Sequence, residues 1–326
     1  MKLTIPTAYD GRPLLDLLRT ELSLSRRLIT ALKQHPTGMM LNGERVTVRC
    51  TLHAGAELQL AVESVTPPHT GTILPVPPAQ PLSILYEDED VTVCNKPADM
   101  PTHPSHGHFT DTLANALADR AAREQPCGTP FVFHPVNRLD RNTSGVVLIA
   151  RHALSAQRLG DAMANGEIRK QYLALVCGTP NPPGGEIVTG IRRQLPSIIL
   201  REVTSLDAPD AAPSHTRYQT LHTFRSPLLT ERTLSLVVAA PLSGRTHQLR
   251  LHFAHLGTPI LGDELYGGEI TAPDDVMPRH ALHSCVLTFP HPRSKQPMRI
   301  TAPLPDDMAR LLPEKFTLPK DLDIFD

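Results

Sequence analysis

A short segment of the chain gathers polar side chains directly ahead of an apolar run. Residues 134–152 read HPVNRLDRNTSGVVLIARH. The apolar run at 146–150 predicts a buried strand, so the polar residues form a loop at a sheet end, where ligand sites often lie. Asp140 in this loop is the candidate for chemistry, because a carboxylate can act as nucleophile or base. A turn that only satisfies its own side-chain hydrogen bonds is the alternative.

Histidines suggest a second kind of site. Two groups have spacings that chelation of a metal would allow: His103, His106 and His108, and His247, His252 and His255. A metal-dependent hydrolase would use such sets, but no carboxylate completes a compact site. The cysteines at 50, 94, 127, 177 and 285 lie far apart, which excludes a CxxC zinc site or a disulfide framework. We therefore predict no bound metal.

The elements that must position Asp140 are mostly strands. Apolar runs predict strands at 82–86, 91–95, 146–150, 172–177, 233–239 and 284–289, and helical spacing predicts helices at 112–123, 154–165 and 246–256. Strands outnumber helices and are often adjacent. The pattern favours an α+β fold, in which a mixed, largely antiparallel sheet is flanked by helices.

The N-terminal part has a different character. Residues 1–64 predict a small α/β domain with leucines at helical spacing, a second helix capped by Ser23 or Ser25, and a hairpin turn at Asn42-Gly43. Residues 65–81 contain six prolines and predict a semi-rigid linker. The main domain would then span 82–305, and 306–326 would form a C-terminal tail.

Charge and hydropathy limit the class of protein. The chain of 326 residues has a net charge of −1, which does not favour a simple polyanion binder; such binding would need basic residues gathered on one face. No apolar run approaches the roughly 18 residues that a membrane span requires. Dispersed thiols and the lack of a hydrophobic N-terminal signal predict a soluble cytoplasmic protein with no membrane partner.

Several motifs together resemble one enzyme family. NRLDRNTSG, residues 137–145, is similar to the HRLDxxTSG signature of the RluA-type pseudouridine synthases. Four other segments also resemble family motifs, and all five occur in the family's order: 95–108, 168–178, 243–267 and 280–292. The resemblance places Asp140 on the essential catalytic aspartate, Tyr172 on the active-site tyrosine and Arg245 on the arginine that pairs with the carboxylate. Two departures are Asn137, where the family usually has His, and Asp99, where it has Gly.

The resemblance implies isomerisation of uridine to pseudouridine in RNA, and we predict no cofactor because this reaction only exchanges bonds within one nucleotide. Arg245 would keep Asp140 ionised, and Tyr172 would stack on the uracil or transfer a proton. The target nucleotide would be flipped out of the RNA, with Arg138 as a wedge or phosphate contact; a salt bridge within the loop is the alternative for Arg138. We also predict RNA contacts for Arg141, His247, Gln248 and Arg250.

Residues 1–64 are similar, more distantly, to the small RNA-binding domain named after ribosomal protein S-four. This implies RNA contacts by Arg26, Arg27 and Lys33, with a purely structural appendage as the alternative. Family members with such a domain mostly modify large-subunit ribosomal RNA, so rRNA is favoured as partner over tRNA, and no protein partner is implied. A catalytically inactive RNA-binding or ribosome-associated protein with the same fold is the alternative function.

Overall fold

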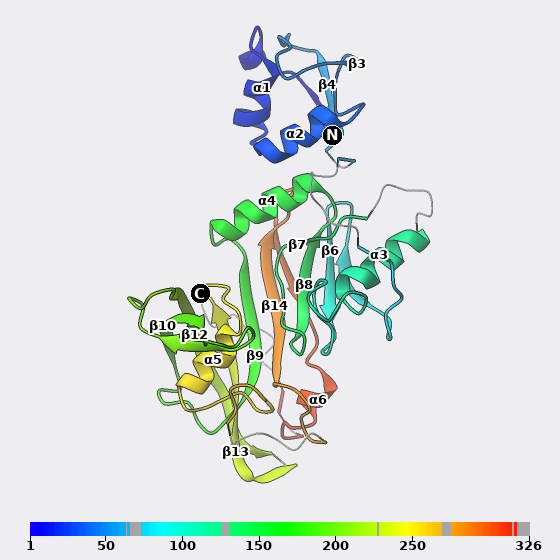
Figure 1. Ribbon diagram of the computed structural model, residues 1–326. Helices are drawn as coiled ribbons and strands as arrows, with labels where there is room; N and C mark the ends of the chain where they lie inside the picture. The colour runs from blue at the N-terminus through cyan, green and yellow to red at the C-terminus, as the bar shows by residue number, and fades with distance from the viewer. Residues whose placement is uncertain are drawn as a thin grey trace.

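The chain folds into a small N-terminal unit and a larger unit built on one long sheet, as the computed structural model in Figure 1 shows. The structure describes residues 1–62, 64–65, 73–124, 131–226, 228–268, 275–314 and 316–317. Residues 66–72 of the predicted linker, Cys127, and residues 315 and 318–326 of the predicted tail lie outside the described residues. No helix in the described part of the chain is long and apolar enough to cross a lipid bilayer.

The N-terminal unit has its own antiparallel sheet and its own apolar core. Four strands pair in the order β1-β4-β2-β3, and the unit also contains three short helical segments and one longer helix. Their bounds are β1 Lys2–Thr4, η1 Thr7–Tyr9, α1 Leu14–Asp16, η2 Leu17–Glu21, α2 Arg26–Gln34, β2 Met39–Leu41, β3 Glu44–Arg45 and β4 Glu57–Leu60.

Local sequence signals explain the boundaries of this unit. The Ser25 hydroxyl accepts a hydrogen bond from the Leu28 backbone N–H at 3.2 Å and so caps α2. Between β2 and β3, Asn42 and Gly43 both have positive φ angles of 50° and 84°, which fits the tight hairpin that the sequence predicted.

Helix α4 (Ala153–Ala164) of the larger unit packs against the N-terminal unit. Ala153 and Leu154 pack into the core of that unit. The Gln157 side chain accepts a hydrogen bond from the Ser25 backbone N–H at 2.7 Å and donates one to the Ser23 carbonyl oxygen. The two units are therefore joined by packing and hydrogen bonds as well as by the connecting chain.

The larger unit is organised on a mixed sheet whose strands follow the order β11-β10-β12-β13-β9-β14-β8-β6-β5, with β15 beside β14 and β7 beside β8. All its strand pairs are antiparallel except β14 with β8, which is parallel. The bounds are β5 Ser83–Glu87, β6 Val91–Lys96, β7 His134–Pro135, β8 Ser144–Ala150, β9 Arg169–Cys177, β10 Gly184–Arg193, β11 Arg201–Thr204, β12 Ala212–Ser226, β13 Leu229–Pro241, β14 Leu282–Pro290 and β15 Pro297–Thr301. The predicted α+β class is confirmed.

Helices cover the two faces of the central strands. Helices α3 (Leu113–Glu124) and α5 (Gln248–His255) contribute to the apolar cluster that contains Val147 and Ile149. On the opposite face, α4 packs on the cluster that contains Val146 and Leu148. A strand covered on both faces has no polar side to present, which explains why β8 is buried along its whole length. A short helix, α6 (Asp306–Ala309), follows the last strand.

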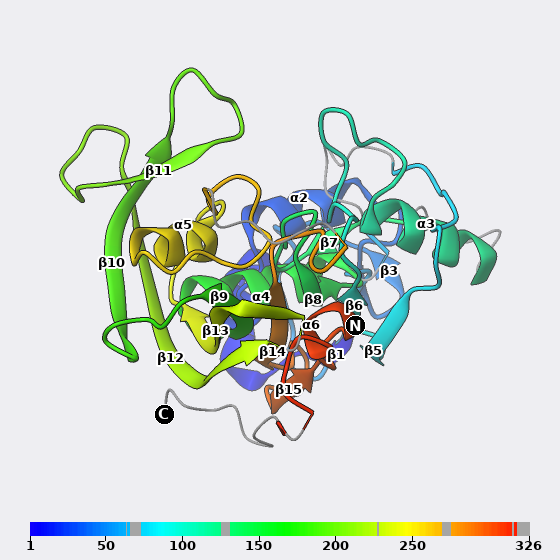
Figure 2. The same cartoon turned by 90° about the horizontal axis from the view of Figure 1, so that it is seen from below.

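The strands β10, β11 and β12 were not foreseen from the sequence. β10 and β12 mix exposed and buried positions, the residues of β11 are all half-buried, and the three strands include many polar side chains, so no apolar run marks them. Figure 2 shows β11 and the loops beside it projecting from the body of the molecule.

Gly145 joins the Asp140 loop to β8 at a point where two backbones almost touch. Its φ angle is +116°, and an added Cβ atom would lie 2.1 Å from the Ser284 carbonyl oxygen of β14. The glycine is therefore required both by backbone conformation and by space.

We expect Gly145→Ala to lower the free energy of unfolding by about 3 kcal/mol or more, because it adds steric overlap to backbone strain. Urea unfolding followed by circular dichroism measures this. Gly160 in α4 is the matched control, since its Cβ would meet nothing within 4 Å; Gly160→Ala should be neutral or stabilising by up to about 1 kcal/mol. Equal stability of the two variants would contradict the steric argument.

Candidate active site

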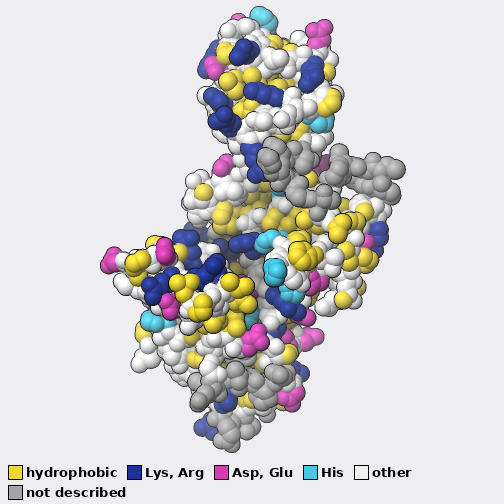
Figure 3. Space-filling model, in the orientation of Figure 1, with side chains coloured by type: hydrophobic (Ala, Val, Ile, Leu, Met, Phe, Trp, Pro, Cys, Tyr) yellow, Lys and Arg dark blue, Asp and Glu magenta, His cyan; other side chains and the backbone are white. Residues whose placement is uncertain are grey.

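A cavity of about 1040 Å³ opens beside the Asp140 loop. Its walls come from segments far apart in the chain: residues 101–108, the loop 135–141, the start of β9, and the turn 240–246 that follows β13. In Figure 3 dark blue and cyan side chains gather around a hollow on this face of the molecule. Asp140 stands at the edge of this cavity with 31% of its side chain exposed, so a ligand can reach its carboxylate.

The cation that faces Asp140 is Arg250. Its Nη1 lies 3.9 Å from Asp140 Oδ2, and its side chain is only 4% exposed. The other edge of the guanidinium is held by Asp263, with Nε donating to Oδ2 at 2.8 Å and Nη2 to Oδ1 at 2.7 Å. A guanidinium held in this two-point manner has a fixed direction, so its remaining edge stays turned to Asp140.

Asp263 is itself fully buried and tied to the backbone. Its Oδ1 accepts hydrogen bonds from the N–H groups of Leu265 and Tyr266 at 3.0 and 3.1 Å. Burial acts to raise the pKa of Asp263, but hydrogen bonding and charge attraction from Arg250 outweigh it and hold that pKa below its usual value. Asp263 is thus a permanent anion that keeps Arg250 charged and oriented.

The predicted ion pair between Arg245 and Asp140 is wrong. Arg245 lines the same cavity but is exposed, and its Nε donates to the Pro213 carbonyl oxygen at 2.9 Å. It precedes α5, whereas Arg250 lies on that helix and is directed inward. Both arginines belong to the same short motif, and sequence spacing alone could not tell which one reaches the carboxylate.

Tyr172 lies on β9, where it is paired with Ala239 of β13 and Ser284 of β14. Burial raises the pKa of its hydroxyl far above the ordinary value, and the negative charge of Asp140 adds to this effect. The side chain is therefore a neutral phenol whose electrostatic environment includes Asp140.

Lys96 is a buried group at the site that the sequence reasoning missed. Its Nζ donates to the carbonyl oxygens of Pro97, Met100 and Arg141 at 2.8, 2.7 and 3.0 Å. Burial lowers the pKa of Lys96 to about 7, against the opposing influence of Asp140. The lysine fastens the residue after Asp140 to the segment 97–100; its place in the NKPA motif was the available signal.

A second contact fixes the loop on the other side of Asp140. The Thr102 hydroxyl donates to the Leu139 carbonyl oxygen at 2.9 Å and lies 3.1 Å from the Leu139 backbone nitrogen, which donates to it. Segments 96–102 and 139–141 therefore hold each other, and the position of Asp140 depends on both.

The two departures from the family pattern are accommodated by local bonding. Asn137 donates from Nδ2 to the Val146 carbonyl oxygen at 3.0 Å and accepts at Oδ1 from the Leu148 N–H at 2.8 Å. Asp99 has a positive φ of 58°, a conformation that glycine adopts freely, and its Oδ1 accepts from Arg141 Nε at 2.7 Å.

The residues predicted to contact RNA divide into exposed and buried sets. Arg138 and Arg141 are exposed and line the cavity, and Arg26, Arg27 and Lys33 are exposed on α2. Two assignments are wrong, because the side chains are buried and bonded within the protein: Gln248 and Arg250.

His247 was also in the predicted RNA-contacting set. It is half-buried, has a left-handed φ of 57°, and pairs its Nδ1 with the Tyr266 hydroxyl at 2.8 Å. Burial lowers the pKa of His247, with Asp140 acting in the opposite direction.

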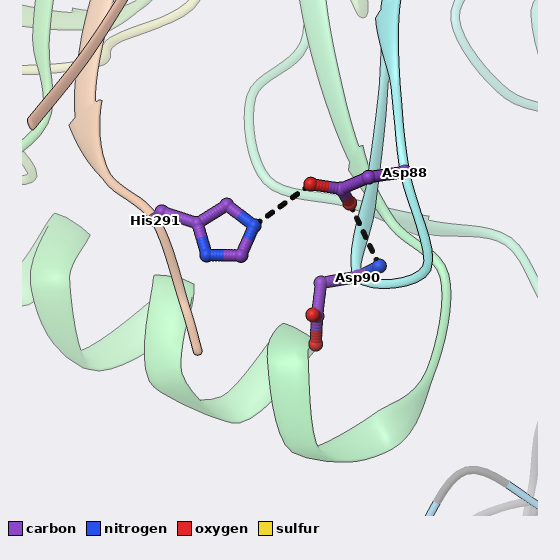
Figure 4. A group of neighbouring side chains, drawn as sticks. All are labelled: Asp88, Asp90 and His291. Carbon is purple, nitrogen blue, oxygen red and sulfur yellow. Dashed lines mark hydrogen bonds and ion pairs between the residues drawn. The ribbon is translucent and has the colours of Figure 1, made fainter. Parts of the chain in front are cut away.

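In the described part of the chain, Asp88, Asp90 and His291 form a group of side chains that could ligate a metal ion (Figure 4), and none of the three lines the cavity. Their carboxylate oxygens already accept hydrogen bonds. Asp88 Oδ1 accepts from the Asp90 and Val91 N–H groups, Asp88 Oδ2 pairs with His291, and Asp90 Oδ2 accepts from Arg293 Nε. The group ties the β5–β6 turn to the segment after β14.

Two of the six histidines that suggested chelation, His252 and His108, are hydrogen-bonded within the protein. His252 is buried and pairs with the hydroxyls of Ser214 and Thr216 at 2.9 Å each. His108 pairs with Asp111 and Arg141. These contacts are those of hydrogen-bonded structural histidines.

Comparison with known proteins decides the family. A family description for RNA pseudouridylate synthases matches residues 90–255, which contain Asp140, Tyr172 and Arg250. The chain belongs to the RNA pseudouridylate synthase family. It is 37% identical over 292 residues to the uncharacterized RNA pseudouridine synthase YjbO of Bacillus subtilis, covering 90% of this chain and 95% of that one.

Other relatives agree with this assignment. The chain is 36% identical over 283 residues to ribosomal large subunit pseudouridine synthase D of Xanthomonas campestris, covering 84% of this chain and 80% of the relative. The solved structure of human RNA pseudouridylate synthase domain containing 1 matches with a TM-score of 0.57 and 27% identity, over 74% of this chain and 92% of that one. The chain is therefore an RluA-type RNA pseudouridine synthase.

We expect Arg250→Met to lower the free energy of unfolding by about 3–5 kcal/mol, because it leaves the buried Asp263 carboxylate without its cation. Arg245→Met is the matched control; its side chain is exposed, so the change should stay within about 0.5 kcal/mol. Both values come from urea unfolding. A variant at 250 as stable as the one at 245 would mean that the Arg250–Asp263 pair does not form.

Proposed function

We propose that this RNA pseudouridine synthase modifies a uridine in structured large-subunit ribosomal RNA, with Asp140 as its catalytic carboxylate. The observation that carries the proposal is an accessible carboxylate at the edge of a large cavity, facing a buried arginine. The rRNA substrate is supported by the relatives named for the large ribosomal subunit. We place the activity in the cytoplasm, in agreement with the dispersed cysteines.

The charge of the cavity supports an RNA substrate. Although the whole chain carries a net charge of −1, the cavity lining includes a single carboxylate and six basic side chains. The basic residues are Arg138, Arg141, Arg169, Lys170, Arg217 and Arg245. Two of them also pair with acidic residues, Arg141 with Asp99 and Arg217 with Glu186. Basic side chains around the cavity attract the phosphate groups of RNA. The Asp140 carboxylate then remains free to contact the nucleoside.

The reaction exchanges bonds within one nucleotide. The bond between the ribose C1′ and N1 of uracil breaks, the base turns, C5 bonds to C1′, C5 loses a proton and N1 gains one. No atom is added, so the site needs a negative group beside the electron-poor sugar and room for the base to turn. Asp140 supplies the first, and the open cavity supplies the second. Because the target base of a paired region is hidden, the uridine must be flipped into the cavity.

Arg250 and Tyr172 have supporting roles in this proposal. Arg250 keeps the Asp140 carboxylate charged and directed while the base covers it. Burial raises the pKa of the Tyr172 hydroxyl, so the residue stays a neutral phenol near neutral pH, and of the two roles that the resemblance implies we propose stacking on the uracil rather than proton transfer. Arg138, exposed beside Asp140, is placed to occupy the space that the flipped nucleotide leaves.

We expect Asp140→Asn to abolish pseudouridine formation while RNA affinity stays within about threefold, because one carboxylate oxygen becomes an amide of similar shape. Mapping of pseudouridine in total RNA, with and without the wild-type protein, first identifies the target. Single-turnover assays and filter binding on that RNA then compare the variants. Tyr172→Phe, which keeps the ring, should retain more turnover than Asp140→Asn.

Two outcomes would count against this mechanism. Normal turnover by the Asp140→Asn protein would remove the carboxylate from the reaction. RNA binding by the wild-type protein without any pseudouridine formation would favour the inactive RNA-binding alternative.

We further propose that residues 1–64 form an RNA-binding domain whose contacts come from α2. Arg26, Arg27 and Lys33 are exposed on this helix, while Leu28 and Ile29 face the core. Helix α2 begins directly after Ser23 and Ser25, whose backbone groups bond to Gln157 of α4. These bonds fix the start of α2, and so its basic side chains, relative to the larger unit.

We expect the combined variant Arg26→Gln, Arg27→Gln and Lys33→Gln to weaken RNA binding about tenfold or more at low salt, because phosphate contacts are lost. The single-turnover rate at saturating RNA should change less than about twofold. Filter binding at two salt concentrations and a single-turnover assay measure the two effects. Replacing Lys2, Arg12 and Arg49 by Gln is the control for total charge, and equal weakening by that variant would show that α2 has no special role.

A further inference from the structure

The hairpin formed by β10 and β11 ends in an exposed apolar loop. Leu195, Ile198 and Ile199 are 82%, 73% and 57% exposed. Arg192 and Arg193 lie at the end of β10 next to this loop. Apolar side chains flanked by arginines suit a nucleic acid, because apolar groups insert against bases while guanidinium groups meet phosphates. We call the hairpin and its loop, residues 184–204, the arm.

The loop of the arm is held by Arg201, the first residue of β11. The Arg201 guanidinium donates from Nη1 to the carbonyl oxygens of Ile198, Ile199 and Leu200 at 3.3, 3.0 and 3.0 Å, and so fixes the loop. The backbone N–H of Arg201 donates to the hydroxyl oxygen of Tyr266 at 3.0 Å. The loop is therefore linked to Tyr266 through hydrogen bonds.

Tyr266 also reaches the catalytic ion pair. Its hydroxyl pairs with Nδ1 of His247, the residue that precedes α5, at 2.8 Å. Its ring lies under the guanidinium of Arg250, with Cζ 5.1 Å from the ring centroid. Its backbone N–H donates to Asp263, the carboxylate that orients Arg250. One side chain thus touches the arm, the start of α5 and the cation that faces Asp140.

We propose that Tyr266 is a positioning residue whose hydroxyl couples the arm to the Arg250–Asp140 pair, so that RNA bound by the arm supports the geometry of the reacting carboxylate. This inference rests on the proposed function. The hydroxyl of Tyr266 bonds to two segments that are far apart in the sequence, at residue 201 in the arm and at residue 247 before α5. His247 has a left-handed backbone, a conformation that costs energy and persists only where surrounding contacts enforce it. Without the hydroxyl, the ring, His247 and Arg250 lose their common anchor.

Tyr266→Phe tests the coupling, because it keeps the ring under Arg250 and removes only the hydroxyl. On an RNA that the wild-type protein modifies, the single-turnover rate at saturating enzyme should fall about tenfold, the effect of roughly one hydrogen bond on a barrier. The Kd for the RNA should change less than about threefold. An unchanged rate would overturn the proposal.

A matched control and a double-mutant cycle separate coupling from general damage. Tyr86→Phe removes another tyrosine hydroxyl, one that donates to Asp88 outside the cavity lining, and should leave the rate unchanged. The arm variant replaces Leu195, Ile198 and Ile199 by Ser and should slow the bound reaction. When combined with Tyr266→Phe, its loss should be clearly smaller than the product of the two single losses, as for residues that act together. Losses that multiply in full would overturn the coupling.

Hydrogen exchange gives a readout that does not depend on activity. The Arg201 amide should exchange faster in Tyr266→Phe than in the wild-type protein, because its acceptor is gone. Unchanged exchange there would mean that the tether to the arm does not exist. A wild-type protein that modifies no RNA would refute the proposed function, whereas an active wild-type protein with an indistinguishable Tyr266→Phe variant would refute this inference alone.

Discussion

The site depends on one buried arginine placed between two carboxylates of different accessibility. Asp263 is sealed in the protein and grips Arg250 at two points, whereas Asp140 meets the remaining edge of the guanidinium from the cavity side. A buried guanidinium needs an anion to remain stable, and Asp263 meets that need permanently. Asp140 is therefore not needed to neutralise the buried guanidinium, and its carboxylate oxygens remain available to a ligand.

The same constraint explains why the Asp140 loop is held so thoroughly. A carboxylate that must meet both a fixed cation and a mobile nucleoside cannot sit on a loose segment. Lys96 bonds to the Arg141 carbonyl oxygen and Thr102 to the Leu139 carbonyl oxygen. These contacts are buried or partly buried, and they restrain the loop against the segment 96–102. A few residues further along the chain, Gly145 allows β8 to lie close against β14. Reactions that require alignment of a base and a sugar benefit from such restraint.

Charge distribution reconciles a nearly neutral chain with an RNA substrate. Net charge describes long-range behaviour, but binding depends on where the basic groups gather. The cavity lining is strongly basic, and the exposed face of α2 adds further cations in the N-terminal unit. Acidic side chains instead serve internal networks, such as the Asp88, Asp90 and His291 group and the pair of Arg279 with Asp307.

The amino-acid sequence by itself determined the elements with strong local signals. The buried strands β6, β8, β9 and β14 and the helices α3, α4 and α5 follow from apolar periodicity, because strands covered on both faces must be apolar throughout. The motif around Asp140 identified the candidate catalytic residue and the family. What the tertiary structure alone decided was which arginine faces Asp140, that Lys96 and Asp263 support it, and that the half-polar strands β10 and β11 form an arm. Side-chain direction and contacts between distant segments depend on packing in three dimensions, and a one-dimensional pattern with two nearby arginines carries no information about which one turns inward.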